Sequence, residues 1–355
     1  MKKYLTLLAA SLILSQVVTA QKVKYSLISD DPGNYKKTSI GVSFANLDFF
    51  NGFSIGVGGR AETVIKDHIL AYANYSWAWV DQIGSEENYS YKYPEPKEGR
   101  KGYTNFTIGC SYFLLDMNSP QRLRITLKKT RMGRYEIEHY TMIPGTVKHL
   151  LGIDAGFSRV KKPVKLDFND SAFHYQSLDN SIDLPLNSAF VMGEPNQPAG
   201  NPTTLYTTSS TYNIYLGARY RNVRNLFIAV EDLGKRSNTL MYDVYADFVY
   251  SPQTTVSHVV DQEGVEWKLS APAKVFNHVG YKIGVDRRSG NTCQVTYHFE
   301  IGKIPGVVSG KTWAESGGHV SFGMTLAINS RLHFGKNTTS ATKPKPQETA
   351  PNPSI

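Results

Sequence analysis

The side chains most capable of chemistry are charged residues at every second position of strand-like segments. Asp243 and Asp247 alternate with apolar residues in "LMYDVYADFVY" (240–250), and Lys282 and Asp286 do so in "YKIGVD" (281–286). This spacing puts the charges of each segment on one face of a strand. If such faces enclose a narrow space, opposite charges are expected to pair, because an unpaired buried charge is costly. The set that shares this placement is Arg60, Glu62, Asp154, Arg219, Asp243, Asp247, Lys282, Asp286, His298, Glu300 and Arg331.

Motifs for catalysis or for metal and cofactor binding are missing from the sequence. "PGVVSGKT" (305–312) departs from a phosphate-binding loop, because Pro305 replaces the first glycine and a strand-like segment follows. The nine histidines lack metal-ligand spacing. His258, His298 or His319 could serve a hydrolase, but nothing selects a serine and an acid to go with them. We therefore expect no enzyme, no metal and no cofactor, and the scattered basic residues predict no nucleic-acid binding.

The segments that carry these residues have the two-residue period of β-strands. In "VSFGMTLAINSRLHF" (320–334) the first residue and each second one after it are apolar, except for Ser330. The same alternation recurs over 53–65, 69–80, 103–114, 211–221, 239–250, 279–285 and 293–301, and more weakly near 38–46 and 148–159. Tight connections are predicted at 66–67, 116–120 and 287–291, and long ones at 82–102, 161–210, 251–277 and 303–317. The sequence predicts an all-β protein.

The apolar face of these strands contacts either lipid or a protein core. The segments span roughly 10 to 14 residues, longer than the ~5–6 of globular sheets and sufficient for the ~9–11 that cross a bilayer at a tilt. Aromatic residues near the segment ends are typical of an interfacial girdle, namely Trp77, Trp79, Tyr103, Tyr250 and Phe334. These features favour a transmembrane β-barrel. A secreted soluble β-sandwich that binds ligands stays open as the alternative.

The first twenty residues predict export. Lys2 and Lys3 precede an apolar run, and Val18 and Ala20 occupy the small-residue positions before a cleavage site. No later run of 18 apolar residues predicts a transmembrane helix. Cys110 and Cys293 lie on the apolar faces of distant strands, so we expect two unpaired thiols. The formal charge of +9 suits an anionic membrane surface and equally an ordinary basic surface.

The signal peptide, the repeated alternating strands and a last strand ending in "SRLHF" resemble the outer-membrane β-barrel proteins of the Bacteroidota. The resemblance implies an antiparallel barrel of about ten strands, within roughly eight to fourteen, with long extracellular loops and short turns on the periplasmic side. The expected organisation is a signal peptide at 1–20, a periplasmic segment at 21–37, the barrel at 38–334 and a disordered Pro-rich periplasmic tail at 335–355. Residues 121–143 are charged on both faces and predict a hairpin outside the barrel wall, while 222–238 predict a longer connection.

The expected function follows from a narrow interior. A barrel of about ten strands is only slightly wider than one that side chains fill, so paired charges are expected to plug the lumen. We predict a non-enzymatic structural or accessory subunit of a larger outer-membrane complex for protein export or membrane-protein assembly. Its partners would be outer-membrane lipid and other outer-membrane or periplasmic proteins, contacted through loops 161–210 and 251–277 and the tail 335–355. A narrow porin-like channel for small solutes is the alternative.

Overall fold

The structure is a computed structural model that describes residues 23–50, 53–82, 95–96, 103–167, 174–185, 204–260, 265–270, 276–290, 293–308 and 316–330. The segments expected to be a signal peptide (1–20) and a Pro-rich tail (335–355), together with Arg331 and Phe334, lie outside these residues. No helix among the described residues is long and apolar enough to cross a membrane.

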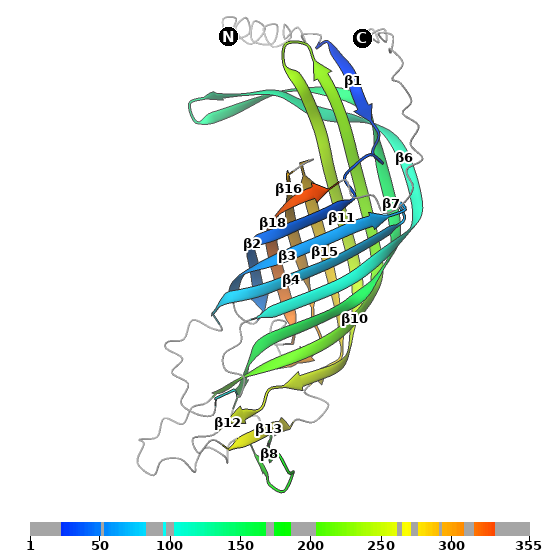
Figure 1. Ribbon diagram of the computed structural model, residues 1–355. Coiled ribbons are helices and arrows are strands. Elements are labelled where there is room, and N and C mark those ends of the chain that lie inside the picture. Colours follow the sequence, from blue (N-terminus) through cyan, green and yellow to red (C-terminus); the bar gives the residue numbers. More distant parts are fainter. Residues whose placement is uncertain are drawn as a thin grey trace, which may run out of the picture.

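The chain forms a closed antiparallel β-barrel (Figure 1). The main sheet has eleven strands; one of them, β1, pairs only with β10, and the other ten close on themselves. Closure comes from the β7–β10 pair and from β18 pairing with β2. The ten wall strands are β2 Thr38–Phe50, β3 Phe53–Ile65, β4 Ile69–Gln82, β6 Thr104–Met132, β7 Tyr135–Asp167, β10 Thr204–Val230, β11 Gly234–Val256, β15 Val279–Ser289, β16 Cys293–Lys303 and β18 Gly318–Ser330. The predicted all-β barrel of about ten strands is confirmed.

The outer surface of the barrel is apolar and the inner surface is polar. Along β11, Asp243, Tyr245 and Asp247 are buried while Val244 and Phe248 are exposed. The same outward placement recurs around the wall, at Ile40, Val42, Ile108, Leu216, Ile283 and Phe299. No second sheet covers this face in the described part of the chain, in contrast to a β-sandwich, whose apolar faces pack together. The barrel therefore presents to its surroundings the apolar band that contacts lipid in membrane barrels.

The aromatic residues expected in the girdle divide into two groups. Trp77 and Tyr250 are each 47% exposed and lie on the outer surface. Tyr103 is only 3% exposed and packs inside against Ala78, Val160 and Ile304, so the prediction for Tyr103 is corrected. It precedes the first residue of β6, where the two-residue alternation no longer fixes its direction. The side chain of Trp79 lies outside the described part of the structure.

Four hairpins, β3–β4, β6–β7, β10–β11 and β15–β16, turn at the end of the barrel that also carries β1 (Tyr25–Asp30), and this end is termed the β1 end. Two strand pairs continue beyond the wall there, since β6 has 29 residues and β7 has 33, against the ~9–11 that cross a bilayer. The turn predicted at 116–120 is therefore wrong, because β6 runs through it without a break. The connection predicted at 222–238 is also wrong: β10 and β11 fill it, leaving a tight turn at residues 231–233. Residues 121–143, which are charged on both faces, form the end of β6 and the start of β7 beyond the wall.

The part of these hairpins beyond the wall, with β1, forms what we term the β1-end extension. In Figure 1 the β6–β7 hairpin crosses the β10–β11 hairpin, and β1 lies along β10. Asn238 and Arg236 donate hydrogen bonds to the carbonyls of Arg124 and Leu127 across this crossing. The extension has its own apolar core, made of Leu123, Ile125, Ile143, Val147, Leu226, Ile228 and Val230.

The opposite end, termed the loop end, carries two small sheets. One contains β5 Glu95–Pro96, β12 Val259–Val260, β13 Glu266–Ser270, β8 His174–Ser177 and β9 Asp183–Pro185. The other pairs β14 Phe276–Asn277 with β17 Gly306–Val307. Residues 304–307 are buried, so the start of "PGVVSGKT" folds inward as a short strand. The predicted long loop at 161–210 is shorter than expected, because β7 runs to Asp167 and β10 begins at Thr204.

Candidate functional site: the filled lumen of the barrel

Strand register brings the lumen charges together. Arg221 lies directly opposite Asp243 on the neighbouring strand, and Asp243 lies directly opposite Asp286 on the next one. Two like charges in directly opposite positions destabilise a sheet. Arg288 offsets this repulsion, because its Nη2 lies 2.7 Å from a carboxylate oxygen of Asp243 and 3.4 Å from one of Asp286. The four residues therefore form one connected ion-pair cluster.

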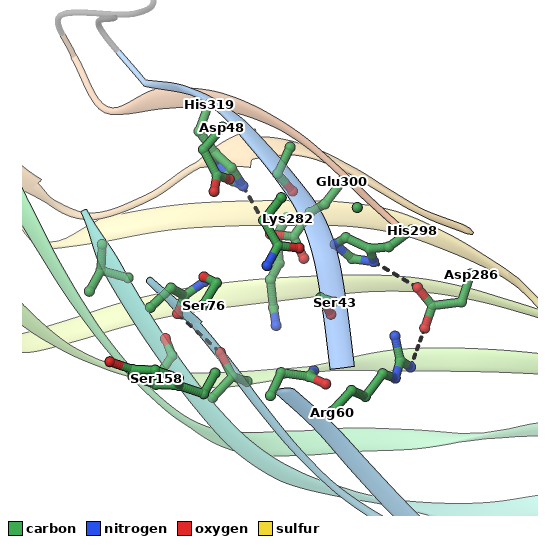
Figure 2. Close-up of a pocket in the computed structure, with 18 of the residues that line it drawn as sticks. Ser43, Asp48, Arg60, Ser76, Ser158, Lys282, Asp286, His298, Glu300 and His319 are labelled. Atoms are coloured by element: carbon green, nitrogen blue, oxygen red, sulfur yellow. Dashed lines mark hydrogen bonds and ion pairs between the residues drawn. The ribbon is translucent and has the colours of Figure 1, made fainter. Parts of the chain in front are cut away.

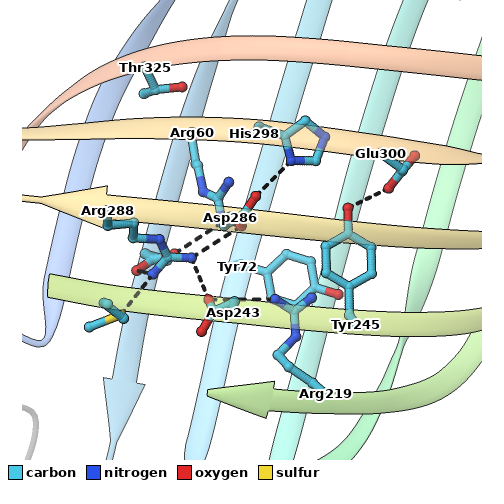
Figure 3. A network of polar contacts seen from close by, with 12 residues as sticks. Arg60, Tyr72, Arg219, Asp243, Tyr245, Asp286, Arg288, His298, Glu300 and Thr325 are labelled. Atoms are coloured by element: carbon cyan, nitrogen blue, oxygen red, sulfur yellow. Dashed lines mark hydrogen bonds and ion pairs between the residues drawn. The ribbon is translucent and has the colours of Figure 1, made fainter. Parts of the chain in front are cut away.

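Asp243 is the centre of this cluster (Figure 3). Arg221 binds both of its carboxylate oxygens, with Nε and Nη2 at 2.6 and 2.7 Å. Arg288 contacts the same carboxylate and reaches across the lumen to Glu62 of β3. The side chains of Asp243 and Arg221 are 0% exposed and that of Arg288 is 1% exposed. The cluster thus connects strands from opposite sides of the barrel through charge-assisted hydrogen bonds.

A second cluster surrounds Asp154 of β7. Its carboxylate accepts hydrogen bonds from Tyr72 at 2.9 Å, from Ser111 at 2.8 Å and from Arg219 at 2.6 Å. The guanidinium of Arg219 also lies over the rings of Tyr72 and Tyr245, 4.7 and 4.8 Å from their centroids. These contacts place a buried cation between an acid and two aromatic faces, which stabilises its charge in the absence of bulk water.

Two further pairs face the loop end (Figure 2). Asp286 accepts hydrogen bonds from Arg60 and, at 2.7 Å, from Nδ1 of His298. Glu300 accepts one from Tyr245, and Nε2 of His319 lies 2.9 Å from its other oxygen. The placement of Lys282 is similar, because its ammonium lies 3.2 Å from Asp247. All ten predicted lumen residues within the described chain therefore take part in ion pairs.

The lumen is closed at the β1 end by an apolar cluster. Asn225 donates hydrogen bonds to the carbonyls of Asp31 and Asn34, which holds the segment after β1 against the barrel. Tyr35 of this segment is buried in a cluster with side chains from the wall. The cluster includes Val64, Leu70, Phe113, Leu150, Val223 and Met241. Together with the Asp243 cluster, these buried side chains fill the lumen at this level.

The loop-end half of the lumen contains a polar cavity of about 120 Å³. Six of the predicted charged residues line this cavity, namely Arg60, Arg219, Lys282, Asp286, His298 and Glu300. Hydroxyl and amide side chains supply most of the remaining lining. No group of three His, Cys, Asp or Glu residues in the described part of the chain could hold a metal ion.

Sequence reasoning missed several residues of the two clusters. Arg221 continues the alternation of Arg219 as the last residue of the predicted segment 211–221, but it was not included among the lumen charges. Arg288 continues that of Asp286, but it fell within a predicted turn. Tyr72 and Tyr245 alternate with the apolar residues of their strands, and this alternation could have placed both aromatic side chains inside the lumen. Nothing in the sequence indicated that Tyr35 closes the β1 end, because its contacts come from distant strands.

Outside the lumen, two further observations bear on the sequence. Cys110 and Cys293 are both unpaired and exposed on the outer face, as predicted. On the β6–β7 hairpin, Lys129 donates a hydrogen bond to Glu138 and thereby lowers the pKa of that carboxyl below its usual value. Arg124 contacts the same carboxylate at 2.7 Å, so Glu138 remains an anion among cations there.

Comparison with solved structures finds outer-membrane proteins at low similarity. The chain is similar to the toluene transporter TodX of P. putida, at 9% identity over 84% of this chain and 90% of that chain, with a TM-score of 0.27. For a FadL homologue of Pseudomonas aeruginosa the identity is 8%, the match covers 86% of this chain and 95% of that chain, and the TM-score is 0.18. For OmpT of Vibrio cholerae the identity is 8%, the match covers 85% of this chain and 99% of that chain, and the TM-score is 0.16. No family model and no curated protein matches the chain.

These scores are too low to support an argument about function. The protein is a membrane β-barrel protein, and this rests on its closed strand order and its apolar outer face. The sequence-based exclusion of an enzyme is corrected by the comparison, because OmpT of Vibrio cholerae is among the similar structures and the exclusion therefore does not hold. At a TM-score of 0.16 the likeness assigns no reaction to this chain.

Proposed function

We propose that the protein is a closed outer-membrane barrel, of the Bacteroidota type and exported by its signal peptide, that serves as a structural or accessory subunit of a larger outer-membrane assembly. Protein export and membrane-protein assembly are the processes that we propose for this assembly. The β1 end would face the periplasm, because short turns face that side in outer-membrane barrels.

The observation that carries the proposal is the exposed apolar surface of the β1-end extension. Ile143 belongs to the core face of β7, and by strand alternation Ile137 and Tyr135 lie on that same face. They lie beyond the crossing with β10 and β11, where they are 41% and 79% exposed. A core face that continues into solvent is a surface that a partner protein can cover.

Charge on this hairpin indicates the kind of partner. Between Arg122 and Glu138 the chain carries six cationic side chains and two carboxylates. Arg124 lies over the ring of Tyr140, 4.1 Å from its centroid, and Tyr140 is itself exposed. Aromatic and arginine side chains are enriched at the centres of protein interfaces. By strand alternation Tyr140 lies on the face of β7 opposite to Ile137, so both faces of the hairpin suit a partner that carries acidic and apolar groups.

The closed lumen supports the same proposal. The Asp243 cluster and the apolar cluster around Tyr35 fill the barrel where a solute would have to pass. Barrels that conduct freely generally have ~16–18 strands and an aqueous interior. A wall with a filled interior, a rigid extension and an exposed apolar surface has the properties of an anchor for other proteins.

The test is a change of the exposed surface that leaves the barrel intact. We expect the variant with Tyr135→Ser, Ile137→Ser and Tyr140→Ser to lose a large complex that the wild type forms in native gels of detergent-solubilised outer membranes. The matched control carries Leu178→Ser and Ile182→Ser, which remove exposed apolar side chains at the loop end. Migration of the wild type as a single barrel, or an intact complex in the triple variant, would contradict the proposal.

A further inference from the structure

We propose that the protein forms a symmetric dimer, in which the free edge of β7 in one copy pairs with the same edge in a second copy. The pairing segment is residues 135–143 of β7, in the β1-end extension. The contact would join two hairpins into one antiparallel sheet with the strand order β6–β7–β7–β6. It involves two copies of this chain alone, so it does not depend on the accessory role proposed above.

The edge of β7 is free because β1 takes its place beside β10. From Asp167 to Val147, β7 pairs with β10 on one side and runs beside β6 on the other. Beyond Val147 the two strands diverge, and β1 pairs with β10 at residues 226–230. Within the described part of the chain, residues 135–146 therefore pair only with β6. Such an edge presents a row of unpaired backbone N–H and C=O groups, which is a template for another strand.

One contact shows which backbone groups of this edge point outward. The N–H of Thr146 donates a hydrogen bond to the carboxylate of Asp30 on β1 at 2.8 Å, so it points away from β6. Backbone groups alternate in direction from one residue to the next along a strand. Pro144 is two residues away and shares the outward direction, so its missing N–H costs no bond to β6. The further residues with outward N–H and C=O groups are Glu136, Glu138, Tyr140 and Met142.

The other two free edges of the extension are less suited to pairing. On β6, Pro120 and a register shift after Thr126 interrupt the outer edge. The carbonyls of Arg124 and Leu127 on β6 already accept hydrogen bonds from β11. The third edge belongs to β1, which has only six residues and a register shift of its own. Prolines, bulges and short strands protect edges from pairing, whereas residues 135–143 contain no proline and are paired with β6 without a skipped residue.

Charge and hydrogen bonding select the register in which two such edges meet. Registers centred on Ile137 or Glu138 would place a carboxylate of one copy directly opposite a carboxylate of the other, and like charges in that position are destabilising. A register centred on Tyr140 would bring Pro144, which has no N–H, into a hydrogen-bonded pair. A register centred on His139 avoids both. All four outward residues of each copy then face outward residues of the other.

This register also brings complementary side chains together. It places Glu138 of each copy opposite Tyr140 of the other. Arg124 lies over the ring of Tyr140, 4.1 Å from its centroid, and 2.7 Å from Glu138 of its own copy. The guanidinium would therefore lie beside a carboxylate of each copy, and opposite charges attract. On the other face of the sheet, exposed Ile137 is placed opposite Thr141, a cross-strand contact that removes part of its side chain from water.

The position of the hairpin suits a contact between two barrels. In Figure 1 the β6–β7 hairpin bends away from the wall strands and reaches past the β10–β11 hairpin. It can therefore meet the same hairpin of a second barrel whose β1 end lies on the same side of the membrane. Two-fold dimers are the commonest homo-oligomers, and this one leaves neither β7 edge unpaired.

Cysteine cross-linking of the purified full-length barrel in detergent tests the proposal. The two native cysteines are first replaced, as Cys110→Ala and Cys293→Ala. The two copies of residue 139 would lie directly opposite each other, with Cα atoms roughly 4.5–5.5 Å apart, a distance that a disulfide spans. We expect His139→Cys to form a disulfide-linked dimer under mild oxidation, visible on a non-reducing denaturing gel.

Ile137→Cys is the matched control for chance collisions. Its two copies would lie four residues apart along the strand pair, about 13 Å at the rise of a β-strand. We therefore expect no cross-link from Ile137→Cys alone or from Thr141→Cys alone. A mixture of the two variants, refolded together, should cross-link, because positions 137 and 141 face each other in the proposed register.

A proline variant separates backbone pairing from contact between side chains. Glu138→Pro, combined with His139→Cys, removes one outward N–H and leaves the bonds to β6 in place, so we expect about a tenfold loss of cross-linked dimer. Glu138→Thr keeps the N–H and should retain most of the dimer. Heat-modifiable gel migration verifies that each variant is folded, and Tyr140→Pro replaces Glu138→Pro if the latter does not fold.

The purified chain contains no further partner, so these results are separate from those for the accessory role. The proposal is overturned if His139→Cys stays monomeric under oxidation. It is overturned equally if Ile137→Cys alone cross-links as well as His139→Cys, or if the folded proline variant cross-links like its parent.

Discussion

Replacing Asp243 with Asn is expected to lower the free energy of unfolding of the barrel by about 3–5 kcal/mol, the usual cost of removing one partner from a buried ion pair. The carboxylate accepts hydrogen bonds from Arg221 and Arg288, and all three side chains are at most 1% exposed. The neutral amide would leave two buried guanidinium groups without their shared anion. Urea titration of the barrel in lipid vesicles measures the change.

Two variants separate this effect from general damage to the wall. Asp116→Asn breaks a pair with Lys148 in which Asp116 is 31% exposed, and it should cost at most about 1 kcal/mol. Replacing Arg221, Asp243 and Arg288 together by Met, Leu and Met removes these three charges, and Arg60 remains paired with Asp286 and Glu62. Because apolar side chains of similar volume often replace a buried ion pair without loss, this variant should recover part of the stability lost in Asp243→Asn. Equal stability of Asp243→Asn and wild type would show that the cluster does not hold the barrel.

The second large effect is expected from Gly156→Ala, which should lower the free energy of unfolding by about 1–3 kcal/mol through overpacking. A Cβ at position 156 would lie 2.3 Å from the hydroxyl of Tyr215 and 2.3 Å from the carbonyl oxygen of Ile108. Tyr215 would have to leave its place over Gly156, where its hydroxyl lies 2.9 Å from that of Tyr72 and donates to the Ile108 carbonyl at 3.2 Å. Loss of this contact also weakens the Asp154 cluster.

Gly59→Ala is the matched control, because the same methyl group would meet only a carbonyl oxygen of Gly41 at 3.9 Å. Its expected effect is within about 0.5 kcal/mol, as for most substitutions away from close contacts. The urea midpoints of the two variants, measured side by side, give the comparison. If both glycines tolerate alanine equally, the account of the packed interior is wrong.

The two-residue alternation was sufficient to predict the wall of the barrel. It placed Asp243, Asp286 and their neighbours on one face of their strands, and the structure pairs them across the register. The order of the strands could be inferred as well, because hairpins join neighbours and the last strand, β18, meets the first wall strand, β2. Alternation is a local property, and these features depend on local pattern and connection length alone.

Features that depend on depth or on distant contacts could not be predicted. Strands that leave the membrane lose the apolar band on one face. The end of β6, after residue 115, and the start of β7 were therefore interpreted as a turn and a separate hairpin. Arg288 was assigned to the predicted turn 287–291, and Arg221, at the end of the predicted segment 211–221, was not included among the lumen charges. Tyr35 packs with wall residues from six strands at the β1 end, which no pattern within its own segment indicates. The cavity at the loop end is lined by residues of all ten wall strands, so it depends on the sizes of side chains that are distant in the sequence.

Conductance of the purified full-length protein in a planar lipid bilayer tests the central claim most directly, because that claim is a lumen closed by the Asp243 cluster and the apolar cluster around Tyr35. The account predicts no stable conductance steps from the wild type in concentrated potassium chloride, with insertion verified by heat-modifiable migration of the recovered protein. Steady and reproducible open steps from the wild type would contradict the account. They would favour a narrow porin-like channel over an anchor for a larger assembly.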